Sequence, residues 1–172
     1  YLGLPSLIGH GKKKAFNRIK DQLGRKIASW KGKLLSLAGK EVLIKAIAQA
    51  IPTYTMSCFK LPDSLCKELN SMISKFWWGQ KSDEQKISWV SWDKLCKSKD
   101  MGGMGFRDLK AFNLALLAKQ GWRLLQNTNS LFHHVFQAKY FAGRSFLEAQ
   151  LSKRPSFAWR SILAAKSVVE DG

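Results

Sequence analysis

Apolar residues recur at every third or fourth position over much of the chain, which is the spacing of one buried face of an α-helix. Charged and polar residues fill most positions between them. Six stretches show this pattern, and each predicts a helix: residues 13–30, 36–51, 64–78, 109–126, 131–141 and 157–169. The predicted fold class is therefore mainly α.

The three N-terminal helices have clear predicted apolar faces. On the first, the face comprises Phe16, Ile19, Leu23, Ile27 and Trp30. On the second, Ser36 is the expected N-cap, Lys40 and Lys45 point away, and the apolar face comprises Leu37, Val42, Leu43, Ala46, Ile47 and Ala50. Asp63 is expected to cap the third helix, whose buried face comprises Leu65, Leu69, Met72, Ile73, Phe76 and Trp77.

Strand signals are few. Residues 87–90 predict one short strand, and the glycine-rich residues 102–106 predict a tight turn into a second. Together they predict at most one short β-ribbon. The polar residues 79–86 are the predicted boundary between a basic N-terminal part and an aromatic-rich C-terminal part.

Positive charge is concentrated at the N-terminal end. The 172 residues contain 29 Lys and Arg against 12 Asp and Glu, a formal net charge of +17. Twelve of the cations and two of the acids lie within residues 12–60, which leaves about +10 in that part. Helices that bury one face and are basic on the other favour a polyanionic partner, with nucleic acid ahead of an anionic membrane surface.

Cysteine usage and hydropathy indicate the compartment. Cys58, Cys66 and Cys96 are odd in number and widely spaced, which predicts thiols in a reducing environment rather than disulfides or a metal site. No apolar stretch has the length to span a bilayer, and no signal-peptide pattern is present. We expect an intracellular protein (nuclear, cytoplasmic or organellar) that is not secreted. The start at Tyr1 predicts a piece of a longer polypeptide.

Catalytic constellations are not visible in the sequence. The adjacent acid pairs at 83–84 and 170–171 lack the setting of a two-metal site. His133 and His134 are neighbours on a helix and face different directions, and residues 102–105 lack the Lys and Ser or Thr of a phosphate loop. We expect no catalytic residue and no metal ligand in this chain.

The order of short motifs resembles the region downstream of the polymerase active site in non-LTR (LINE-type) retrotransposon reverse transcriptases of plants. The resemblance covers about residues 1–141, with a weaker echo at residues 156–162. The matching runs, in order, are YLGLP (1–5), WKGKLLS (30–36), AGKE (38–41), LIK (43–45), IPTY (51–54), MS (56–57), LP (61–62), FWWG (76–79), ISW (87–89), GGMGFR (102–107), FN (112–113), ALLAKQ (115–120) and WRL (122–124).

This resemblance implies three parts. Residues 1–11 resemble the end of a palm-like primer-grip segment, which includes Tyr1, Leu2 and Gly3. Residues 12–80 resemble a basic helical thumb, and residues 81–172 an aromatic-rich helical connector that is truncated at the C-terminus. The aspartates that hold catalytic Mg²⁺ lie upstream in that family, so the resemblance implies that this chain has no cofactor and is not itself an enzyme. The implied partners are an RNA–DNA or DNA duplex and the rest of the reverse transcriptase, without a membrane.

The candidate nucleic-acid contacts are the basic residues of the N-terminal helices. They are expected to contact phosphates without reading bases. The candidates are Lys12, Lys13, Lys14, Arg18, Arg25, Lys26, Trp30, Lys31, Lys33, Lys40 and Lys45. For any single lysine the alternative is a solvated helix face, and for Trp30 packing is favoured over base stacking. The remaining tryptophans are expected in the core: Trp77, Trp78, Trp89, Trp92, Trp122 and Trp159.

The leading functional hypothesis is a non-catalytic reverse-transcriptase fragment that binds template–primer duplex, either working or as a degenerate relic. The alternative is a small autonomous basic nucleic-acid-binding protein. A third reading is a peripheral membrane protein that uses the amphipathic helix at residues 13–30. The coding frame upstream of Tyr1 separates the first two, because an aromatic-x-Asp-Asp motif there belongs to a polymerase.

Overall fold

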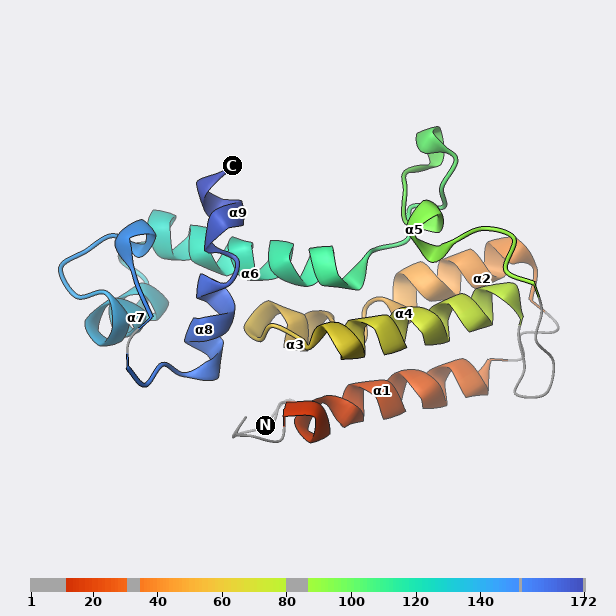
Figure 1. Ribbon diagram of the computed structural model, residues 1–172, viewed down its shortest axis with the longest axis horizontal. Helices are drawn as coiled ribbons and strands as arrows, with labels where there is room; N and C mark the ends of the chain where they lie inside the picture. Colours follow the sequence, from red (N-terminus) through yellow and green to blue (C-terminus); the bar gives the residue numbers. More distant parts are fainter. Residues whose placement is uncertain (1–11, 31–34, 80–86, 152, 172) are drawn as a thin grey trace. The chain divides into compact units, whose positions relative to one another are not determined.

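The computed structural model describes residues 12–30, 35–79, 87–151 and 153–171, and within them the fold is helical without a β-strand. The prediction of a mainly α fold is confirmed. The helices, in chain order, are α1 (Lys12–Ser29), α2 (Leu37–Leu43), the π-helix η2 (Ile44–Ala48), α3 (Thr53–Cys58), α4 (Asp63–Trp78), α5 (Trp92–Leu95), the 3-10 helix η3 (Lys99–Met101), α6 (Leu109–Gln126), α7 (Leu131–Tyr140), the 3-10 helix η4 (Phe146–Glu148), α8 (Phe157–Leu163) and α9 (Lys166–Glu170) (Figure 1).

Two compact units divide the chain. The first comprises residues 1–54 and 61–111, and the second residues 55–60 and 112–172. The division therefore falls within α6 and sets most of α3 with the second unit. Most of the sequence-predicted boundary at 79–86 lies outside the described residues, and the three implied parts (1–11, 12–80 and 81–172) stay a prediction.

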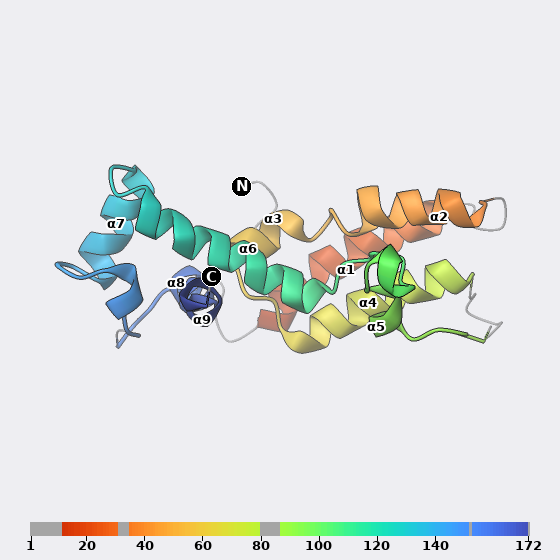
Figure 2. The same cartoon turned by 90° about the horizontal axis from the view of Figure 1, so that it is seen from above.

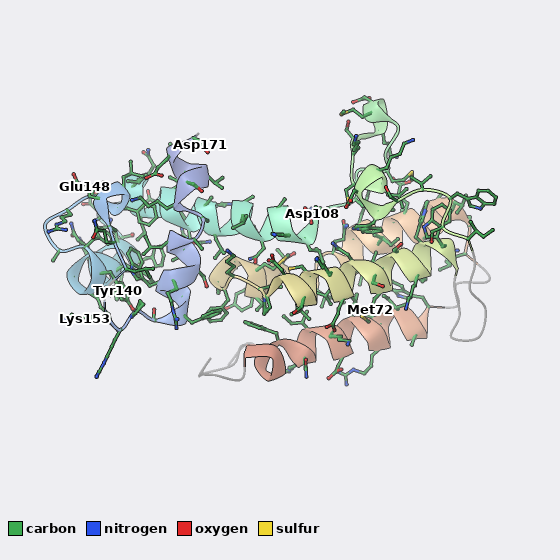
Figure 3. All side chains as sticks on the ribbon, in the orientation of Figure 1. Met72, Asp108, Tyr140, Glu148, Lys153 and Asp171 are labelled. Carbon is green, nitrogen blue, oxygen red and sulfur yellow. The ribbon has the colours of Figure 1, made fainter. Side chains whose placement is uncertain are left out.

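The first unit is built on the packing of α1 against α4, which run side by side (Figures 1 and 2). Phe16 and Leu23 from α1 and Leu69 and Ile73 from α4 are completely buried, as the apolar spacing predicted. Gly24 lets the two helices come close, because a Cβ there would lie 3.3 Å from Cε of Met72. Figure 3 shows Met72 between these two helices.

The caps explain where the helices of the first unit begin and end. Ser36 caps α2 as predicted, since its Oγ accepts a hydrogen bond from the amide of Gly39 at 3.1 Å. The prediction for Asp63 is wrong: Pro62 occupies the N-cap of α4, and the Asp63 carboxylate pairs with Lys110 at 2.7 Å instead.

The predicted apolar face of the second helix is wrong in part: Leu43 and Ile47 are half-buried, but the other four residues are exposed. Leu37 and Val42 are 66% and 62% exposed, whereas Ile44 and Ala48 are buried. Beyond α2 the chain continues as the π-helix η2, which contains the buried Ile44 and Ala48 and in which the amide of Gln49 donates to the carbonyl of Ile44. A π turn holds an extra residue, so the helical period that the prediction assumed does not continue through it.

The predicted β-ribbon does not form among the described residues. Residues 87–90 have no regular structure, and the amides of Met104 and Phe106 both donate to the carbonyl of Leu95. The glycine-rich loop therefore closes on the end of α5 rather than pairing with a strand. Gly103 fits there because a Cβ would lie 2.1 Å from the carbonyl oxygen of Lys97.

The second unit has an aromatic core around Trp159, which is fully buried. Its indole stacks on Tyr140 with ring centroids 4.7 Å apart and on Phe141 at 5.7 Å, and Phe146 meets it edge-on at 6.0 Å. Tyr140, labelled in Figure 3, also donates a hydrogen bond to Ser156 at 2.8 Å. The long predicted helix at 157–169 is in fact two, α8 and α9, which run across α6 (Figures 1 and 2).

Candidate nucleic-acid interface

The outer face of α1 carries the exposed cations of the predicted interface. Because Phe16, Ile19 and Leu23 are buried, the opposite side of this helix faces solvent. Arg18 and Arg25 are exposed there. They are two turns apart, which places them on one side of the helix about 10 Å from each other.

Two further exposed cations lie on α1. Lys26 is exposed, one residue beyond Arg25. Lys20, which the prediction did not include, donates to Glu68 at 2.7 Å, and this hydrogen bond and the carboxylate charge raise the pKa of its ammonium group. Asp21 is also exposed on α1. Within the described side chains of α1, Arg18, Arg25 and Lys26 are therefore the cations without a protein ion pair.

Lys40 and Lys45 are used inside the protein. Lys40 donates to the carbonyl of Trp77 at 3.3 Å. Lys45 pairs with Glu41 at 2.8 Å and lies 5.9 Å from the centre of the Phe106 ring, within the range of a cation–π contact. Lys40 and Lys45 therefore differ from the unpaired cations of α1, because both already have partners within the protein.

Glu41 joins two cations at the same point. Its Oε1 is 2.8 Å from Nζ of Lys45 and 2.9 Å from Nζ of Lys99. These two hydrogen bonds lower the pKa of the Glu41 carboxyl group below its ordinary range. The cluster therefore links α2, η2 and η3 and leaves Lys45 little freedom to reach a ligand.

Trp30 packs against the protein, which agrees with the expectation that packing is favoured over base stacking. It is half-buried, with its ring centroid 5.0 Å from that of Phe76. The remaining predictions lie outside the described residues or side chains: Lys12, Lys13 and Lys14 begin α1 without described side chains, and Tyr1, Leu2, Gly3, Lys31 and Lys33 fall in undescribed segments.

Two of the tryptophans expected in the core are exposed. Trp77 and Trp159 are buried, and Trp78 and Trp92 are half-buried. Trp89 and Trp122, in contrast, are 78% and 48% exposed, so the prediction is wrong for both. Trp89 lies in the irregular segment before α5, where no neighbouring helix covers it.

The two neighbouring histidines have different surroundings. His133 is buried, with Nδ1 2.7 Å from the carbonyl oxygen of Leu124, and His134 is exposed. Among the described residues, no three His, Cys, Asp or Glu side chains come close enough to hold a metal ion. In the same part of the chain, no helix has the length and apolar character to cross a membrane.

The sequence reading missed a polar stripe on α4. Lys67, Ser71, Ser74 and Lys75 line one shallow cleft with Trp92. The sequence shows that these residues recur at every third or fourth position, as on one side of a helix. It does not show which segment faces them. Only the fold shows that α5 approaches this stripe.

Comparisons with known proteins give two relatives, both from Arabidopsis thaliana. Uncharacterized mitochondrial protein AtMg00310 is 48% identical over 124 residues, which cover 72% of this chain and 80% of that protein. Putative ribonuclease H protein At1g65750 is 36% identical over 172 residues, which cover 98% of this chain but only 28% of that protein. No protein-family model matches the chain, and no solved structure matches it.

Proposed function

The chain belongs to the family of the Arabidopsis mitochondrial protein AtMg00310, and on that premise we propose that it is the thumb and connector part of a retrotransposon reverse transcriptase. In this proposal it binds template–primer duplex through the sugar–phosphate backbone and catalyses no reaction itself. The observation that carries the proposal is the exposed basic face of α1, with Arg18, Arg25 and Lys26 opposite a buried apolar stripe.

The ordered motifs and the second relative support this proposal together. The motif runs from YLGLP to WRL follow the order of the region downstream of a reverse-transcriptase active site. The relative named for a ribonuclease H is matched along nearly the whole of this chain but over only 28% of its own length. This fits a chain that forms one part of a longer nucleic-acid enzyme.

The physical mechanism is phosphate neutralisation. Arginine guanidinium groups donate in a fork that suits phosphate oxygens, and the Lys26 ammonium group acts as a point charge. Since these side chains project from a rigid helix anchored by its buried stripe, they hold their spacing as the duplex slides past. Backbone contacts of this kind do not depend on base sequence.

A second candidate function is a small autonomous nucleic-acid-binding protein. The match over 80% of AtMg00310 favours it, because that protein consists mostly of the shared region. The upstream coding frame separates the two proposals: an in-frame aromatic-x-Asp-Asp motif supports the polymerase, and a start codon close to Tyr1 supports the autonomous protein.

The test of duplex binding is charge reversal on α1. The variant carrying Arg18→Glu, Arg25→Glu and Lys26→Glu has its net charge lowered from +17 to +11. Each lost phosphate contact reduces the logarithmic salt slope by about 0.9, so three lost contacts reduce it by about 2.7. Fluorescence anisotropy with two RNA–DNA hybrids of unrelated sequence, from about 50 to 200 mM salt, measures both slope and sequence dependence.

The matched control reverses three exposed cations of the second unit, Lys119, Arg144 and Lys153. It carries the same net charge, so any effect of total charge is equal in both variants. We expect the α1 variant to lose affinity for both hybrids and the control to retain most of it. Equal loss in the two variants would contradict a specific interface on α1.

A further inference from the structure

The outer side of α6 carries an exposed tryptophan between polar groups. Lys119, Trp122 and Gln126 are three and four residues apart, so they lie on one side of the helix, and all three are exposed. The opposite side, with Leu117 and Leu124, is buried. Because Trp122 is 48% exposed, a ligand in solvent can reach its indole ring directly.

Arg123 lies beside this stripe and is held by two contacts of its own. Its guanidinium group lies over the Phe132 ring of α7, 5.7 Å from the ring centroid, and its Nη1 donates to Oε1 of Gln120 at 3.1 Å. Arg123 is nevertheless exposed, and one hydrogen bond leaves most of its five N–H donors for another acceptor. Since the side chain is already ordered, a phosphate contact costs it little conformational entropy.

The helix pair α6 and α7 has no acidic residue in the second unit. Residues 112–147 contain four Lys or Arg and no Asp or Glu. The acids that follow are largely engaged elsewhere: the Glu148 carboxylate accepts from the amide of Ser145 at 3.0 Å, and Glu170 pairs with Lys166 at 3.4 Å. A surface with cations of one sign and no acid favours a polyanionic ligand.

A polar cleft continues the stripe at the C-terminal end of α6. It has a volume of about 300 Å³ and is lined by residues 126–130, the turn between α6 and α7. Gln126, Asn127 and Asn129 are exposed there, so their side-chain amides are accessible. An amide group both donates and accepts hydrogen bonds, as the edge of a nucleobase does, and Asn and Gln pair with base edges for this reason.

We propose that this surface binds single-stranded nucleic acid, with an unpaired base stacked on Trp122, phosphates at Lys119 and Arg123, and a base edge in the amide-lined cleft. Aromatic rings beside cations are the elements that bind single strands in general, because every base has a face that stacks. A duplex is disfavoured here, since its base faces are covered by their neighbours. The inference goes beyond the proposed duplex binding and uses residues of the second unit alone.

The experiment measures binding of a fluorescent single-stranded RNA decamer, its DNA counterpart and an abasic decamer to the full chain. Trp122→Ala should weaken binding of the decamers with bases by about 5- to 150-fold, the equivalent of one lost base–aromatic stack. Binding of the abasic decamer, which keeps the phosphates, should not change. Trp89→Ala is the matched control, because Trp89 is also exposed but lies in the first unit. Equal weakening by the two variants, or equal weakening for the abasic decamer, overturns the proposal.

A second pair of variants keeps the test valid if Trp122→Ala does not fold. Lys119→Gln should reduce the logarithmic salt slope of decamer binding by about 0.7, the value for one phosphate contact on a single strand. Lys60→Gln, which removes an exposed lysine outside this surface, should leave the slope unchanged. Equal slopes in these two variants count against the site. Poly-glutamate that competes as well as the decamer at equal charge would assign the surface to an acidic polypeptide and overturn the proposal.

Two charge-reversal variants separate this site from the duplex interface. The variant reversed at Lys119, Arg144 and Lys153 should lose decamer affinity and keep affinity for a blunt RNA–DNA hybrid. The variant reversed at Arg18, Arg25 and Lys26 should do the opposite. Loss of decamer affinity in the α1 variant alone overturns the single-strand site, whereas loss of hybrid affinity in neither variant contradicts only the duplex proposal.

Discussion

Gly121 is the position where a single methyl group should do the most damage to the second unit. It lies within α6 and is buried, and a Cβ there would be 2.9 Å from Cε1 and Cζ of Phe146 and 3.2 Å from Cγ2 of Val169. Ordinary carbon contacts begin at about 3.5 Å, so the aromatic ring must move by roughly half an ångström or more. That ring also packs on Trp159, which leaves it little room to retreat.

The magnitude of Gly121→Ala follows from two opposed effects. Alanine is favoured over glycine in a helix interior by about 1 kcal/mol. Overpacking of a tight core costs about 1–3 kcal/mol. We therefore expect a net loss of stability of about 0–2 kcal/mol, against the gain that helix propensity alone would give.

Gly39→Ala is the matched control. Gly39 is also a helical glycine, but its added Cβ would meet Leu35 and Ser36 at 3.5 Å, which is ordinary contact. This variant should gain up to about 1 kcal/mol. Each kcal/mol corresponds to about 2–4 °C in Tm for a chain of this size, so thermal unfolding followed by circular dichroism resolves the two variants.

A rescue variant tests the proposed cause. If the Phe146 ring is the obstacle, Gly121→Ala should cost less in a Phe146→Leu background than in the natural one, since the two residues are in contact. Stabilisation by Gly121→Ala equal to that by Gly39→Ala would refute the packing argument. So would strict additivity of the two substitutions.

Three further predictions concern the first unit and the thiols. Gly103→Ala should disrupt the loop after α5, because its Cβ would lie 2.1 Å from the Lys97 carbonyl oxygen, and limited proteolysis should show new cleavage there. Glu41 has a pKa lowered from 4.5 by its two lysine partners, so its stabilisation is present above about pH 4.5 and is lost as the pH falls through the folded pKa; Glu41→Gln should flatten the acid side of a stability–pH curve, and an unchanged curve would count against the cluster. Burial raises the pKa of Cys66 to about 11, so alkylation at about pH 8 followed by peptide mass spectrometry should modify it only on unfolding, later than the half-buried Cys58.

The sequence located the helices well because each buries a regular stripe. Residues 109–126 were predicted as one helix and form α6 over that same range. The buried residues of α1 and α4 were also largely predicted, since a 3.6-residue period continues through both. At residues 44–48 the period changes in a π turn, and no sequence pattern announced that change.

The sequence also predicted only part of the candidate site. The sequence placed Arg18, Arg25 and Lys26 on the exposed side of a helix, because the neighbouring apolar residues fixed which side is buried. It did not show that Lys45 lies over Phe106. The Lys45–Glu41 pair is four residues apart and follows from charge spacing along a helix, whereas the contact with Phe106 joins residues far apart in the chain, about which charge patterning carries no information.

Composition and periodicity alone thus determined the helical class, the excess of positive charge and the basic outer side of α1, since these depend on residues within a few turns of one another. Only the tertiary structure decided which cations have partners. It also decided that Trp89 is exposed and that α5 brings Trp92 to the polar side of α4. The physical reason is that burial and ion pairing depend on which distant segments meet, and this is settled by the packing of the whole unit.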